Sequence, residues 1–243
     1  PGNIVDEIEM LFREYGVRYY FFLDETFTMN HSRIENICRL IVEKKLPIRW
    51  TCDTRADRVT KKILADMKSA GCRMIRIGIE SADPKVLKAV GKGIHLEHVE
   101  RAVRWCRELR IKVIGFFILG LPYETPESIK RTLRFAKKLR LTQAYFSMLV
   151  PLPGSPIWDM AQEGKLIRCT AKDWDSFTRY DDAIVESDSL TAAALSRSHR
   201  RIIRSYYLNI GFIMRKIREI DSLKTLSVYI KGALKILGLS IKY

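Results

Sequence analysis

Residues 113–125 read VIGFFILGLPYET, an apolar run that passes directly into a Gly-Leu-Pro turn. A short, continuous apolar run bounded by turn residues is typical of a strand buried on both faces, as in a parallel sheet. Pro126 then opens a helical pattern that ends near Leu139, so strand, turn and helix follow one another. This succession is the βα unit of a parallel sheet.

The same plan recurs along the chain. Further strands are predicted at VRYYFFL (17–23), IRWTCDT (48–54), MIRIGI (74–79) and AYFSMLV (144–150). Apolar spacing predicts helices from Asn3, over Ile34–Ile41 and Ile63–Met67, from Pro84, and over His95–Leu109, Pro126–Leu139 and Pro156–Glu163. This alternation predicts an α/β fold with a parallel sheet, whose chemistry collects at the carboxyl ends of the strands.

The character of the chain changes after Gly164, which suggests three parts. Residues 1–164 hold the βα units, and 165–190 lack periodicity and carry an acidic cluster that includes Asp181, which predicts a linker or loop. Residues 191–243 form a basic helical extension, with helices expected at 191–207 and 222–237. From Arg197 onward there are eleven Lys or Arg against two acids, so this tail carries nine of the fifteen net positive charges. Such a tail meets anionic lipid, nucleic acid or an acidic partner, or is a solvated face.

Cysteine usage and hydropathy bear on the compartment. The five cysteines are odd in number and far apart, which suits reduced thiols in the cytoplasm. No apolar run approaches the roughly 20 residues that span a bilayer, and no signal peptide is evident. We expect a cytoplasmic protein, with peripheral membrane contact through the basic tail as a further option. Because Pro1 stands within a helix start, we also expect a fragment of a longer protein.

Adjacent acids follow the strand at 17–23. Asp24 and Glu25 could hold an ammonium group or orient a polar ligand at a strand end. Alternatively they cap the next helix, where a side-chain oxygen accepts from unpaired backbone N–H groups. The sequence leaves both interpretations open.

Glu80 and Ser81 come immediately after the strand at 74–79. A carboxylate and a hydroxyl at this position can bind ribose or amino donors of a ligand. The structural alternative is an ion pair of Glu80 with Arg55 or Arg76. The position at a strand end favours the functional interpretation.

Two further strand ends are rich in Gly or Pro. Gly115 and Gly120 would let a flat ligand approach the main chain, although Gly-Leu-Pro is also an ordinary turn. The segment 150–155 (VPLPGS) suits a platform for a purine ring, or an abrupt chain reversal. No metal site is predicted, because His95 and His98 lack a carboxylate or Cys partner, and no catalytic residue is assigned.

Taken in order, LDETF, WTCDTR, IGIESAD, GKG, GFFILGLPYET and PLPGS resemble the barrel of radical S-adenosylmethionine (radical SAM) enzymes. The resemblance covers Pro1 to about Gly164 and is to the branch in which a cobalamin-binding domain precedes the barrel. It implies a partial TIM-type (β/α)6 barrel, here missing its first strand and carrying strands two to six. It also implies S-adenosylmethionine, a [4Fe–4S] cluster on a C-x3-C-x2-C loop, and cobalamin as an option. None of the five cysteines has that spacing, so the cluster ligands are expected upstream of this chain.

The resemblance also implies contacts to S-adenosylmethionine. Asp24 and Glu25 correspond to contacts with the methionine amino group, and Arg55, Glu80 and Ser81 to contacts with its carboxylate and the ribose. Ile118 and Gly120 lie on the motif that lines the adenine, and Val150 and Pro151 on a platform beside it.

The leading hypothesis is therefore the catalytic-domain fragment of a radical SAM enzyme. It would cleave S-adenosylmethionine reductively to a 5′-deoxyadenosyl radical for methylation, cyclisation or rearrangement of a small-molecule or lipid-like substrate, with a flavodoxin or ferredoxin as reductant. One alternative is a non-catalytic barrel that binds a membrane or partner. Another is a relative of RNA-modifying methylthiotransferases, but the tail reads as helices rather than a small RNA-binding β-barrel, so nucleic acid is not expected.

Overall fold

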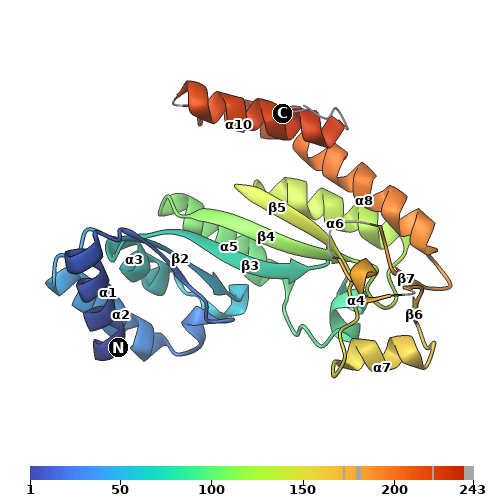
Figure 1. Cartoon of the computed structure of the whole chain (residues 1–243), viewed down its shortest axis with the longest axis horizontal. Helices are drawn as coiled ribbons and strands as arrows, with labels where there is room; N and C mark the ends of the chain where they lie inside the picture. The colour runs from blue at the N-terminus through green and yellow to red at the C-terminus, as the bar shows by residue number, and fades with distance from the viewer. Residues whose placement is uncertain (172, 179–181, 221, 238–243) are drawn as a thin grey trace. The chain divides into compact units, whose positions relative to one another are not determined.

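The computed structural model describes residues 1–171, 173–178, 182–220 and 222–237 (Figure 1). These form two compact units. The first comprises Pro1–Glu80, Lys92–Phe117 and Leu141–Tyr145, and the second Ser81–Gly91, Ile118–Arg140 and the described part of Phe146–Tyr243. Asp181, Asp221 and residues 238–243, which belong to the predicted acidic cluster and basic extension, lie outside the described residues.

The elements follow the predicted alternation through most of the chain. In order they are α1 (Gly2–Tyr15), β1 (Tyr19–Phe22), η1 (Phe27–Met29), α2 (His31–Glu43), β2 (Arg49–Thr54), η2 (Ala56–Arg58), α3 (Lys61–Ser69), β3 (Cys72–Glu80), α4 (Pro84–Ala89), α5 (Leu96–Glu108) and β4 (Lys112–Leu119). After these come α6 (Pro126–Leu139), β5 (Gln143–Met148), α7 (Pro156–Gln162), β6 (Arg168–Cys169), η3 (Trp174–Ser176), β7 (Val185–Glu186), α8 (Ala192–Tyr207), α9 (Ile210–Ile217) and α10 (Leu223–Leu237).

Five strands form one sheet in the order β1-β2-β3-β4-β5. The first three ladders are parallel. Beside β4, the N–H of Thr142 donates to Val113 O (2.9 Å) and the N–H of Leu149 to Leu119 O (2.8 Å), so β5 advances in the same direction. The sheet is open, with β1 and β5 at its edges. This confirms the predicted α/β fold with a parallel sheet, consistent with a partial barrel, and its five strands are at the five predicted places.

The core of the first unit is built from apolar stripes on the predicted helices. Ile34, Ile37 and Ile41 of α2 are buried at helical spacing. Trp50 of β2 is almost fully buried, and its indole N–H donates to Ala70 O at 2.7 Å. Phe27 packs on Trp50 with ring centroids 5.4 Å apart. Each fully buried side chain of this size contributes roughly 1.5–3 kcal/mol, so the base of the sheet is well anchored.

In the second unit, α8 packs against α6 and α10, as Figure 1 shows. His199 of α8 is buried, and its Nε2 lies 2.7 Å from Phe146 O. Burial lowers the pKa of His199, and the bond to Phe146 opposes this only in part. The imidazole is therefore neutral near pH 7 and donates its ring N–H to the carbonyl.

Two elements differ from the predictions. Within 165–190, expected to be a linker or loop, β6 and β7 form an antiparallel pair and Ile167 and Val185 are buried. Two-residue strands leave no periodic pattern in the sequence. The helix α9, capped by Asn209, was also not predicted. Among the described residues, no helix combines the length and hydropathy needed to cross a membrane.

Candidate functional site

Glu80 ends β3 in a backbone conformation that L-residues rarely adopt, with φ at 65°. The ladder to β4 shifts register between Gly78 and Glu80, which marks a bulge. The Glu80 carboxylate pairs with the ammonium of Lys92 at 2.7 Å, and both side chains are less than one-fifth exposed. A Cβ on Gly78 would lie 2.5 Å from Glu80 Oε1 and 2.8 Å from Lys92 Nζ. Gly78 thus provides the space that this ion pair occupies.

Arg55 connects the end of β2 to the same loop. Its guanidinium holds Asp57 through two hydrogen bonds of 3.0 Å and donates to Lys92 O at 3.1 Å. Burial raises the pKa of Asp57, but the bonds to Arg55 outweigh it, so the net shift is downward. Arg55, Glu80 and Lys92 are therefore one network in the first unit.

The structural alternative paired Glu80 with Arg55 or Arg76, but the ion partner of Glu80 among the described residues is Lys92. Arg76 pairs with Asp53 through both carboxylate oxygens, and its guanidinium lies 4.3 Å from the ring centre of Phe21. In the sequence, Lys92 is marked only as the middle residue of the Gly-Lys-Gly segment 91–93. The identity of the partner depends on how the loop after α4 returns to the strand end, which no local pattern encodes.

Asp24 and Glu25 do not cap the helix that follows them. That cap is Asn30, whose Oδ1 accepts from the N–H of Arg33 at 3.0 Å. Asp24 instead accepts from the Arg33 guanidinium at 3.1 Å and stays 38% exposed. Glu25 is exposed. Both carboxylates therefore remain open to solvent, as a ligand contact requires.

Ser81 has a different environment in the second unit. It is fully buried, and its Oγ accepts from the N–H of Asp83 at 3.2 Å and lies 3.4 Å from Thr132 Oγ1. Thr132 also accepts from the N–H of Ala82 at 3.0 Å. The Ser81 hydroxyl thus shapes the turn after β3 through contacts within the protein.

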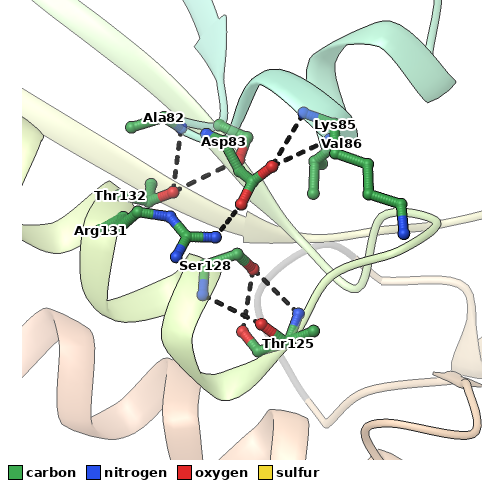
Figure 2. Close-up of polar contacts among 9 residues, drawn as sticks. Ala82, Asp83, Lys85, Val86, Thr125, Ser128, Arg131 and Thr132 are labelled. Atoms are coloured by element: carbon green, nitrogen blue, oxygen red, sulfur yellow. Dashed lines mark hydrogen bonds and ion pairs between the residues drawn. The ribbon is translucent and has the colours of Figure 1, made fainter.

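Asp83 joins this turn to two helices, as Figure 2 shows. Its carboxylate caps α4 by accepting from the N–H of Lys85 (2.9 Å) and of Val86 (3.3 Å), and it pairs with Arg131 of α6. Burial raises the pKa of Asp83, but Arg131 and the two backbone donors more than offset this and lower it overall. The carboxylate is ionised near pH 7 and fixes α4 against α6.

Gly120 and Glu124 form the turn after β4. Gly120 has φ at 92°, and a Cβ there would approach Val185 Cγ2 to 2.9 Å. Its N–H donates to Glu124 Oε2 at 2.6 Å. Glu124 is 1% exposed, and burial raises its pKa to about 8. Among the described residues its Oε1 is buried without a hydrogen-bond partner, so the side chain is a neutral acid near pH 7.

The remaining candidates lie close by in sequence. Ile118 is half-buried between the buried Phe117 and Leu119, so it lies on the more open face of β4. Val150 is half-buried and Pro151 buried. An apolar contact with a flat ligand is available at Ile118 and Val150, whereas Pro151 supports the chain from within.

The cysteines of this chain do not fit an iron–sulfur cluster, which is held by thiolates. All five are free, and four are buried. Burial raises the pKa of Cys38, Cys72 and Cys106 to about 12 and that of Cys52 well above its usual value. In the part of the chain that the structure describes, no three His, Cys, Asp or Glu residues gather as a metal site.

Comparisons with known proteins identify the family of this chain. The family model of the Radical SAM superfamily matches residues 1–136. An uncharacterized methyltransferase of Pyrococcus horikoshii is 33% identical over 217 residues, covering 89% of this chain and 47% of that protein. The anaerobic magnesium-protoporphyrin IX monomethyl ester cyclase of Cereibacter sphaeroides is 32% identical over 162 residues, covering 65% of this chain and 26% of that protein.

Solved structures share the fold. TsrM, a radical S-adenosylmethionine methyltransferase of Kitasatospora setae, was solved with tryptophan and a SAM analogue bound. It is 25% identical, with a TM-score of 0.62 over 67% of this chain and 33% of that one. Its structure with cobalamin and a [4Fe–4S] cluster gives a TM-score of 0.64 at 22% identity, over 81% and 40% of the two chains. The chain spans about half the length of its Pyrococcus relative. With its family model matched over more than half its length, this chain belongs to the radical SAM superfamily.

Proposed function

We propose that the protein containing this chain is a radical SAM enzyme that cleaves S-adenosylmethionine reductively and uses the resulting 5′-deoxyadenosyl radical for methylation or cyclisation. The observation that carries this proposal is the family match over residues 1–136, which includes the strand ends of the first unit. Named relatives that are methyltransferases and a cyclase support the reaction class. They do not favour a non-catalytic module.

In the first unit, the proposed contacts to S-adenosylmethionine are carboxylates and a network of paired charges. Asp24 and Glu25 have solvent-accessible carboxylates that suit the methionine ammonium. Glu80, held in place by Lys92, suits hydroxyl or amino donors, and Arg55 holds the Lys92 loop. Cluster thiolates are not part of this proposal, because the cysteines present do not fit them.

In the second unit, the proposed contacts are mainly apolar. Ile118 and Val150 offer half-buried side chains to the adenine. Gly120 is buried, and Val185, Leu195 and Leu149 fill the space where its Cβ would be, so its proposed part is to hold the turn after β4 beside the adenine. Pro151 and Ser81 support these segments from inside the protein. In this proposal Ser81 therefore positions the turn after β3, and the ribose contact expected of it passes to Glu80.

The proposed substrate is a small or lipid-like molecule, and the proposed reductant is a flavodoxin or ferredoxin. Cobalamin is proposed as a second cofactor, supplied with residues outside this chain. It is supported by the cobalamin-bound form of TsrM, whose fold this chain shares. The free cysteines suit a reducing compartment, so we place the protein in the cytoplasm.

The reaction class can be tested on the full-length protein that contains this chain, reconstituted anaerobically with iron and sulfide and then reduced. We expect 5′-deoxyadenosine to form from S-adenosylmethionine. Glu80→Gln should raise the KM for S-adenosylmethionine about tenfold, the order of one charge-assisted hydrogen bond. Glu43→Gln, an exposed acid on α2, is the matched control. Failure of a cluster-loaded protein to form 5′-deoxyadenosine would overturn the proposal.

Peripheral contact with an anionic bilayer is a second proposal, favoured by α9. Ile210, Met214 and Ile217 recur at helical spacing and are 71%, 46% and 53% exposed, beside Arg215 and the exposed Arg218. Lys216 is only 13% exposed and pairs with Glu219. An apolar stripe flanked by basic residues is typical of an interfacial helix. Replacing the three stripe residues with Ser should abolish co-sedimentation with phosphatidylglycerol vesicles. Equal sedimentation of both proteins would contradict it.

A further inference from the structure

A cavity of about 590 Å³ lies along α8, in the second unit. It is lined by four arginines and a serine: Arg197, Arg200, Arg201, Arg204 and Ser205. A smaller hollow of about 320 Å³ shares Arg197 and Arg200 with it. The volume is within the range of about 300–1,000 Å³ found for small-molecule sites. We call these five residues the arginine cleft.

The guanidinium groups of the arginine cleft are weakly compensated. Arg200 pairs with Asp182 at 3.1 Å, but the side chains are 58% and 82% exposed, and such surface pairs contribute little. Arg204 Nε donates to Ile236 O of α10 at 3.3 Å, which leaves its positive charge unneutralised. Within the described residues, Arg197 and Arg201 contact no carboxylate. The cleft therefore carries a surplus of positive charge.

A further cation lies at the end of the cleft. Lys137, in the last turn of α6, donates to Ser205 Oγ at 2.9 Å. The Ser205 oxygen accepts this bond, so its O–H remains able to donate to a ligand. The cleft thus offers hydroxyl and guanidinium donors together with a nearby ammonium.

Such an arrangement is unfavourable unless an anion is present. Arg197 and Arg201, and likewise Arg200 and Arg204, are four residues apart on one helix, where like charges repel each other. A doubly charged anion converts this repulsion into attraction. Guanidinium forks bind phosphoryl oxygens through paired hydrogen bonds, and Arg is the side chain best suited to that geometry.

We propose that the arginine cleft is a binding site for a phosphorylated group, of the size of a pyrophosphate or a phosphodiester headgroup. This goes beyond the proposed enzyme activity, because none of its residues belongs to the proposed S-adenosylmethionine contacts. The ligand is either a free phosphorylated molecule or the headgroup of an anionic lipid, which present the same chemistry.

The test uses the whole chain and inorganic pyrophosphate, titrated calorimetrically at low ionic strength. Arg197→Gln/Arg201→Gln should weaken binding at least tenfold, since each charge-assisted contact contributes roughly 1.5–3 kcal/mol. The matched control is Arg101→Gln/Arg104→Gln, which removes the same charge from exposed arginines of α5 in the first unit and should bind like the unmodified chain. Circular dichroism of both variants verifies that the helix content of the chain is retained.

A second arm separates the two sources of phosphate. Vesicles of phosphatidylglycerol are compared with vesicles of phosphatidylcholine, using the same variants. Pyrophosphate binding that is lost in the Arg197/Arg201 variant supports a free phosphorylated ligand. Binding to phosphatidylglycerol alone, lost in the same variant, supports a lipid headgroup. The proposal is overturned if neither probe binds, or if the variant and the control bind equally well.

Discussion

At Gly78 the absent side chain is what allows an ion pair to form. A Cβ on Gly78 would lie 2.5 Å from Glu80 Oε1 and 2.8 Å from Lys92 Nζ, too close for the two groups to keep their present positions. A glycine inside a strand is usually a weak point, because it adds backbone entropy and no packing. In β3 this weakness is present at Gly78, but the missing side chain leaves room for the two charged groups, which are each less than one-fifth exposed.

Gly78→Ala should therefore displace both charged groups. The two atoms in the way are the ends of flexible side chains, which can move aside, so we expect a loss below about 1 kcal/mol in the free energy of unfolding, measured in urea. The control is Gly232→Ala, where the added methyl group meets nothing within 4 Å and α10 should be unchanged or stabilised. Equal stability of Gly78→Ala and the unmodified chain would show that the pair is not fixed.

Glu124 makes the stability depend on pH in a direction opposite to that of most carboxylates. Its folded pKa of about 8 lies above the ordinary value of 4.5. Below pH 4.5 both states carry the proton, so the stabilisation is fully present. As the pH rises towards 8, the unfolded chain loses its proton while the folded chain keeps it, and the free energy of unfolding falls.

Glu124→Gln cannot ionise, and its side-chain oxygen can still accept from Gly120. We expect the free energy of unfolding of this variant not to fall as the pH rises towards 8. The variant should therefore be more stable than the unmodified chain at about pH 8. Urea unfolding at about pH 5.5 and pH 8 measures the difference. Parallel pH profiles for the two proteins would show that Glu124 is ionised in the folded state.

At the scale of elements, α6 begins with a reciprocal pair of caps, drawn in Figure 2. Thr125 Oγ1 accepts from the N–H of Ser128 at 3.1 Å, and Ser128 Oγ accepts from the N–H of Thr125 at 2.9 Å. Arg131 and Thr132, one turn later, hold the turn after β3. The start of α6 therefore helps to fix the position of the turn that follows β3.

Thr125→Ala should cost about 1 kcal/mol, the usual contribution of an N-cap. Because α6 holds Asp83 through Arg131, we also expect weaker hydrogen-exchange protection in α4. The control is Thr170→Ala, an exposed threonine outside the helices. Unchanged unfolding of Thr125→Ala would mean that tertiary packing alone fixes the start of α6.

The success of sequence-based prediction also differs between elements. The strands β1–β5 were predictable because each is a stretch rich in apolar, β-branched or aromatic residues that ends in a turn, and α2 because its buried isoleucines are at helical spacing. The hairpin β6–β7 was not, since two residues make no pattern. The helix α9 was missed although Ile210, Met214 and Ile217 recur at helical spacing, so this part of the sequence does carry a helical signal. The exposure of Asp24 and Glu25 and the internal role of Ser81 depend on tertiary neighbours that no local pattern contains.

At the scale of the whole molecule, the sheet is open and β1 is an edge strand. Tyr19 is 71% exposed, Phe21 40%, and the adjoining Leu23 80%. An edge strand presents unpaired backbone N–H and C=O groups, and exposed apolar side chains increase its tendency to pair with another chain. Lysine at such an edge is a common device against pairing between chains.

Tyr19→Lys should therefore reduce self-association of the isolated chain. We expect the unmodified chain to form larger species as its concentration rises, and the variant to remain monomeric at the same concentrations. Sedimentation velocity over a concentration series measures this, with Tyr15→Lys, 71% exposed on α1, as the control. Association that is equal in both variants would place the contact elsewhere.

The open edge has a practical consequence for any experiment on this chain. Folding free energy is a property of one molecule, whereas edge pairing grows with the number of molecules present. Dilution, rather than added stabiliser, is then the appropriate way to keep the chain monomeric. Whether the chain is monomeric or associated therefore depends on the protein concentration, which has to be stated for every measurement.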